Sequence, residues 1–166
     1  MAIKDALLPE FDHEMGSTRR VLERVPAADL KWSPHEKSFN MGKLAWHISN
    51  IPNWIHATLD ASMFDLASMG DDVRPKEPAS VDEVLTAFDE SVKKARAKIA
   101  EQTDSAFLSP WTLKQGGQEM FTMPKISVVR SFVMNHIIHH RGQLTVYLRL
   151  RNVPLPALYG PSADEG

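Results

Sequence analysis

Residues 125–151 have the sequence KISVVRSFVMNHIIHHRGQLTVYLRLR. Apolar side chains recur in this stretch at intervals of three and four residues, the spacing of one face of an α-helix. The core-facing positions of the predicted helix are Ile126, Val129, Val133, Ile137, Leu144, Tyr147 and Leu148. We expect it to be the most deeply buried helix of the chain.

Three earlier segments show the same helical period. The first covers residues 7–25, where Pro9 either starts or bends the helix. The second covers residues 41–66, and Pro52, which lacks a backbone N–H, predicts a kink near residue 48. The third begins after Ser80, which forms a capping box with Glu83.

The segments between these helices predict loops. Residues 70–79 are rich in Asp and Pro, and around Gly116 and Gly117 both a short hairpin and an irregular loop are possible. The proline-rich tail, residues 153–161, cannot be helical. It is nevertheless apolar enough to be ordered along the helices, where it could cover a functional site. The economical architecture is an all-α, antiparallel four-helix bundle forming a single domain over residues 1–166.

Composition excludes several classes of function. The chain has 166 residues, a net charge of −2 and no cysteine. Without a basic field, nucleic acid is not an expected partner. No apolar stretch reaches the roughly 18 residues of a membrane span, and no signal core opens the chain, so a cytoplasmic location is expected by default. Any thiol chemistry requires a thiol from outside.

Two histidines of the last helix form the most informative pair. His136 and His140 lie one turn apart and differ in direction by about 40°. Burying two imidazoles without partners costs each about 1–3 kcal/mol. A shared metal ion removes that penalty, and the alternative for either residue alone is a hydrogen-bonded core histidine.

A third histidine faces inward from the second helix. His47 lies on the same side as Ile51 and Trp54. Three imidazoles can then converge as a facial set that leaves one coordination position open, as in a catalytic zinc site. The other histidines outside the last helix, His13, His35 and His56, are expected at the surface.

Further residues near this set have less certain roles. His139 could replace a ligand, but a supporting hydrogen bond is the preferred role. Gln143 and Tyr147 continue the same face, although Tyr147 could simply pack. Trp54 and Trp46 could line a pocket. The remaining residue, Arg141, is expected off the core face in a surface ion pair, or, more speculatively, to bind a thiol's carboxylate across a dimer. No catalytic side chain is assigned.

Three segments carry a family resemblance: residues 44–48 (LAWHI), residues 136–143 (HIIHHRGQ) and the tail 154–161. Together they resemble the DinB-like (DinB/YfiT) superfamily of metal-dependent enzymes. The resemblance implies a four-helix bundle, often a homodimer, with one divalent metal ion such as nickel or zinc held by His47, His136 and His140. Characterised members include S-transferases and isomerases that use bacillithiol, mycothiol or glutathione.

Three neutral imidazoles around a dication favour an anionic ligand in the open position. We therefore expect an S-transferase in which a small-molecule thiol, ionised at the metal, attacks a small electrophilic substrate. Alternatives are a hydrolase that uses metal-bound water, a non-catalytic metal-binding stress-response module, and a purely structural helical protein. Imidazole ligands also accept copper and iron, so the metal is open.

Overall fold

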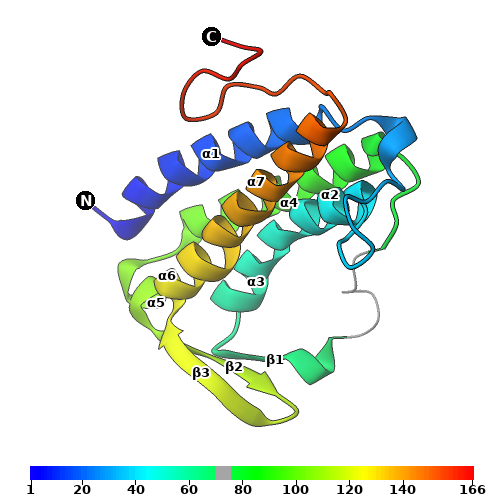
Figure 1. The fold of residues 1–166 in the computed structure, drawn as a ribbon. Coiled ribbons are helices and arrows are strands. Elements are labelled where there is room, and N and C mark those ends of the chain that lie inside the picture. Colours follow the sequence, from blue (N-terminus) through cyan, green and yellow to red (C-terminus); the bar gives the residue numbers. More distant parts are fainter. Residues whose placement is uncertain (70–75) are drawn as a thin grey trace.

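The computed structural model describes residues 1–69 and 76–166. The long helices lie side by side around one apolar core (Figure 1); they are α1 (Ile3–Leu22), α2 (Met41–Asn50), α4 (Val81–Glu101) and α7 (Asn135–Leu150). Phe11, Ile48, Phe88 and Ile137 fill this core at 0–1% exposure. The four segments with helical periodicity therefore do form helices that pack together.

A three-stranded sheet accompanies the helices, so the predicted all-α, antiparallel four-helix bundle is wrong. The fold is mixed, with 61% helix and 10% strand. Strand β1 (Met63–Asp65) pairs in parallel with β2 (Pro110–Gln115), and β2 pairs antiparallel with β3 (Gln118–Pro124). The sheet forms because these segments satisfy their backbone groups through inter-strand hydrogen bonds.

Strands β2 and β3 form a hairpin where the sequence allowed either a hairpin or an irregular loop. Gly116 and Gly117 form its turn with φ values of 60° and 82°, which are accessible to glycine without steric penalty. Asp65 at the end of β1 accepts hydrogen bonds from both glycine N–H groups, at 2.8 and 2.6 Å. One carboxylate therefore fixes the turn to the neighbouring strand.

The second helical run differs from its prediction in two ways. Asn40 caps α2 by accepting from the Lys43 N–H, and the helix gives way to a 3-10 turn at Ile51–Asn53 before α3 (Trp54–Leu59). This break is the expected effect of Pro52, but it lies beyond residue 48. The run also ends at Leu59, because residues 63–65 join the sheet as β1.

The other helices follow the sequence more closely. Pro9 lies inside α1, which begins earlier than predicted. Ser80 caps α4 as expected, and the Glu83 carboxylate accepts a hydrogen bond from the Ala79 N–H. Of the predicted loop 70–79, residues 70–75 lie outside the described residues. Short α5 (Asp104–Leu108) precedes the hairpin. The predicted helix 125–151 is continuous but composite, with α6 (Lys125–Val128), a π-helical segment (Val129–Met134) and then α7.

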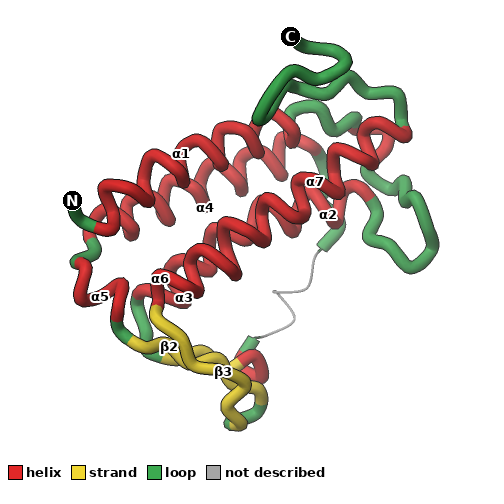
Figure 2. Tube along the Cα trace, turned by 60° about the vertical axis from the view of Figure 1, so that its left-hand side comes forward, coloured by secondary structure: helices red, strands yellow, loops and turns green. Residues whose placement is uncertain are grey.

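The C-terminal tail is ordered and non-helical, as predicted. It packs Val153, Leu155 and Leu158 against the core, and Figures 1 and 2 place it at the opposite end of the helices from the sheet. The Tyr159 hydroxyl donates to the Glu14 carboxylate at 2.7 Å. The tail therefore lies against α1 and does not cover the histidines described below.

Within the described part of the chain, no helix is long and apolar enough to cross a membrane.

Candidate metal centre

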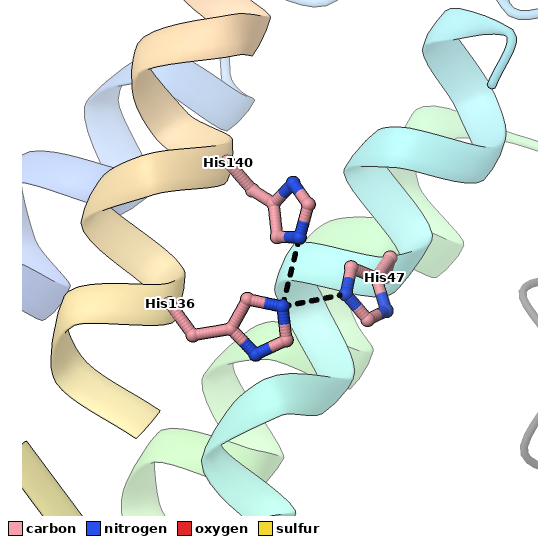
Figure 3. Close-up of side chains that lie close together, drawn as sticks. All are labelled: His47, His136 and His140. Carbon is pink, nitrogen blue, oxygen red and sulfur yellow. Dashed lines mark hydrogen bonds between the residues drawn. The ribbon is translucent and has the colours of Figure 1, made fainter. Parts of the chain in front are cut away.

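Helices α2 and α7 pack together and bring His47, His136 and His140 into one cluster. Figure 3 shows His136 and His140 extending from successive turns of α7 toward His47 on α2. The His136 Nε2 atom lies 2.8 Å from Nε2 of His140 and 3.4 Å from Nε2 of His47. One nitrogen from each ring lies within 4.8 Å of the other two.

The separation of these nitrogens suits a divalent ion. Tetrahedral bonds of about 2.0–2.1 Å place two ligand nitrogens roughly 3.3 Å apart. The His47 to His136 separation matches this value, whereas the 2.8 Å separation is shorter and the third pair is known to lie within 4.8 Å, so the rings would shift to bind an ion with this geometry. Among the described residues, this is the group of three or more His, Cys, Asp or Glu side chains placed to hold a metal ion.

The surroundings keep the three rings neutral at pH 7. Burial, reinforced by His140 and His136, lowers the pKa of His47 from 6.5 to about 4. Burial is also the main cause that lowers the pKa values of His136 and His140. A neutral imidazole offers a nitrogen lone pair, whereas a protonated one cannot bind a metal.

Hydrogen bonds outside the cluster orient two of the rings. The Gln143 Oε1 atom lies 2.7 Å from Nδ1 of His140, so it accepts that N–H and leaves the Nε2 lone pair directed at the cluster. The Gln143 amide nitrogen lies 3.1 Å from Nε2 of His139. The ring of His136 donates to the Phe132 carbonyl in the π-helical segment. The sequence predicted a supporting role for Gln143 but none for Phe132.

The other candidate residues lie outside the cluster of three histidines. His139 is exposed and contacts the cluster only through Gln143 and the His140 ring. Tyr147 donates to the Phe39 carbonyl at 3.2 Å and packs edge-on against Trp32, which is a packing role. His13 and His35 are exposed as expected, whereas His56 is half-buried and bonded to Asp60.

The prediction that Arg141 lies off the core face is wrong. Its side chain is 2% exposed and pairs with Glu14 of α1 at 2.8 Å. It also donates to the Glu14 carbonyl and to the Tyr159 hydroxyl. Because these partners enclose the guanidinium, Arg141 is not available to bind a thiol's carboxylate.

The cluster borders a cavity of about 570 Å³, and the sequence did not predict that a sheet forms part of its wall. His47, His136, Trp46 and Trp54 contribute to the wall from the helices. The opposite walls come from the sheet and the segments beside it: Phe64, Leu66, Met69, Trp111, Leu113, Phe121, Val128 and Phe132. The alternation of buried Trp111 and Leu113 along β2 was the available signal for this wall.

A model of the DinB family matches residues 1–166. The chain belongs to the DinB family. A curated relative is the uncharacterized protein YrdA of Bacillus subtilis (strain 168), which is 24% identical over 168 residues, covering 97% of this chain and 90% of YrdA.

Two solved DinB-like structures share this fold. One, from Bacillus cereus ATCC 10987, has a TM-score of 0.74 at 22% identity and covers 95% of this chain and 98% of its own. The other, YjoA from Bacillus subtilis, has a TM-score of 0.70 at 16% identity and covers 91% of this chain and 95% of its own. At these identities the likeness of the structures extends to the fold, and the site must be argued from this chain's own residues.

Proposed function

We propose that this chain is a metal-dependent S-transferase that joins a low-molecular-weight thiol to a small electrophile. His47, His136 and His140 would hold one divalent ion, with nickel and zinc the leading choices. The observation that carries the proposal is the position of these imidazoles, because His47 and His136 form part of the wall of a cavity large enough for a small substrate.

The donor set defines what such an ion contributes. When bound, the ion is a Lewis acid that favours the ionised form of a thiol or of water. Gln143 holds His140 in the tautomer that presents Nε2. The mostly apolar walls would limit the access of water to the reacting groups, which would strengthen the electrostatic interactions between them.

The lining of the cavity favours an external nucleophile. The chain has no cysteine, and none of the described residues that line the cavity is Asp, Glu, Lys or Arg. In the proposed reaction, the thiol loses its proton and its sulfur forms a bond to the electrophilic carbon. With an epoxide, the C–O bond breaks and the oxygen takes up a proton; with an aryl halide, the halide leaves.

The test is a screen of the metal-reconstituted protein for thiol dependence. Bacillithiol, mycothiol and glutathione are each paired with an epoxide and with a halogenated aromatic. We expect product only when both thiol and metal are present, loss of product in His136→Ala, and retention in His139→Ala. Ester hydrolysis without any thiol would instead identify a hydrolase, and metal binding without turnover of either kind would indicate a non-catalytic module. A homodimer is also part of the proposal, and light scattering measures it.

A further inference from the structure

The walls of the cavity beside the histidines are unusually rich in aromatic rings. They include Trp46, Trp54, Phe64, Trp111, Phe121 and Phe132. Trp54 and Phe64 meet edge to face at 5.2 Å, while Phe121 and Phe132 are stacked at 5.0 Å. Because rings favour other rings in these two arrangements, the cavity offers both edges and faces to an aromatic guest.

Two of the polar groups in these walls already have partners in the chain. The indole N–H of Trp111 donates to the Ala57 carbonyl at 3.1 Å. The amide nitrogen of Asn50 donates to the Trp46 carbonyl at 2.8 Å. These groups therefore have little hydrogen-bonding capacity left for a ligand, and the surface they present is mostly apolar.

Charge points to the same kind of ligand. No formally charged side chain occurs among the described residues of the lining. The Lys76 ammonium lies 4.2 Å from the centroid of the Trp46 ring but is already paired with Glu83 at 2.6 Å, so an ionised ligand group would lose its hydration here without gaining an unpaired counter-charge. A neutral group meets no such penalty, and a volume of about 570 Å³ is within the usual range for small-molecule sites.

We infer that this cavity binds a neutral aromatic group of the substrate, next to the imidazole cluster. The inference deepens the proposed function and rests on it for the reaction, because it assigns the aromatic group to the electrophile. The sheet supplies part of the cavity wall, so β1 and the β2–β3 hairpin determine which substrate is accepted.

The inference is tested by calorimetric binding to chelator-treated, metal-free protein. Three probes share one fused two-ring framework: 2-naphthol is neutral and aromatic, 2-naphthoate is aromatic and anionic, and decahydro-2-naphthol is neutral and saturated. We expect 2-naphthol to bind at least about tenfold more tightly than 2-naphthoate. The affinity of 2-naphthol should exceed that of decahydro-2-naphthol by about two- to tenfold. Absence of 2-naphthol binding, or equal binding of the three probes, would overturn the inference.

The indole N–H signals in a nitrogen-15 NMR spectrum locate the probe. Trp46, Trp54 and Trp111 line the cavity, whereas Trp32 does not and is an internal control. With 2-naphthol we expect shifts of the three lining indoles and little change at Trp32. A shift confined to Trp32 would place the probe elsewhere and contradict the inference.

Two phenylalanines provide a matched pair of variants. Phe132 lines the cavity and is 40% exposed, and Phe39 is 44% exposed but is not part of the lining. Phe132→Ala should weaken 2-naphthol binding about threefold or more, and Phe39→Ala should not. Equal effects of the two variants would count against the site.

Failure of this inference can be distinguished from failure of the proposed function. Aromatic binding to metal-free protein without thiol-dependent turnover in the loaded protein would refute the S-transferase and leave the cavity assignment in place. Thiol-dependent turnover in a protein that does not bind 2-naphthol would refute the cavity assignment alone.

Discussion

The guanidinium of Arg141 on α7 pairs with the carboxylate of Glu14 on α1 at 2.8 Å, with the two side chains 2% and 9% exposed. Tyr159 of the tail donates to the same carboxylate. This pair joins the two helices on a side of α7 that does not carry the histidines. It is a structural element of the fold and is separate from the candidate site.

Breaking this pair should destabilise the chain strongly. Arg141→Met leaves the Glu14 carboxylate buried without its counter-charge, a change that typically costs about 3–5 kcal/mol. The measurement is urea unfolding at pH 7. The matched control is Arg130→Met, which removes an exposed Arg–Glu pair with Glu10 and should cost about 0–1 kcal/mol. Similar losses in the two variants would contradict the structural role of Arg141.

Arg141 also shows the limit of a helical wheel. The wheel gives the direction of a side chain but not how many neighbours surround the helix. Because α7 packs against both α1 and α2, a wide arc of its surface is covered. The fully buried positions are Ile137, Arg141, Leu144 and Leu148, and the histidines lie half-buried at the edge of that arc.

The convergence of the histidines could be anticipated because it depends on local periodicity in two adjacent helices. The sheet could not be anticipated in the same way. Strand β1 has three residues, too few for an alternating pattern, and its partner β2 lies far along the chain. Since such pairing is long-range, the cavity walls at Phe64 and Trp111 had no complete local signature.

Gln143 should strengthen metal binding without holding the metal itself. Gln143→Ala removes the acceptor that orients His140, and loss of such a partner typically weakens metal affinity about 10- to 100-fold. Competition with a chromogenic chelator measures the change. Gln143→Glu, which keeps an acceptor oxygen, should restore most of the affinity. If Gln143→Ala binds as tightly as the unmodified chain, the orienting role is wrong.

Acid should destabilise the metal-free chain through His47. Its pKa is about 4 in the folded chain and near 6.5 when unfolded, so the unfolded state binds more protons between these values. The free energy of unfolding therefore falls as pH drops from 6.5 toward 4, and above 6.5 this residue has no effect. Urea unfolding at pH 7.5, 6.5, 5.5 and 4.5 measures the trend. His47→Gln should lose less stability over the same interval, and an identical pH profile would refute the assignment to His47.

The metal content of the chain tests the central claim most directly. Untagged protein is loaded with zinc or with nickel, desalted and measured by elemental analysis, together with His47→Ala, His136→Ala, His140→Ala and the control His139→Ala. The account predicts one ion per chain in the unmodified protein and in His139→Ala. It predicts far less than one ion in each of the other three variants, because each of them lacks one histidine of the cluster. Absence of metal from the unmodified protein, or a full ion retained when any of those three histidines is replaced, would contradict it.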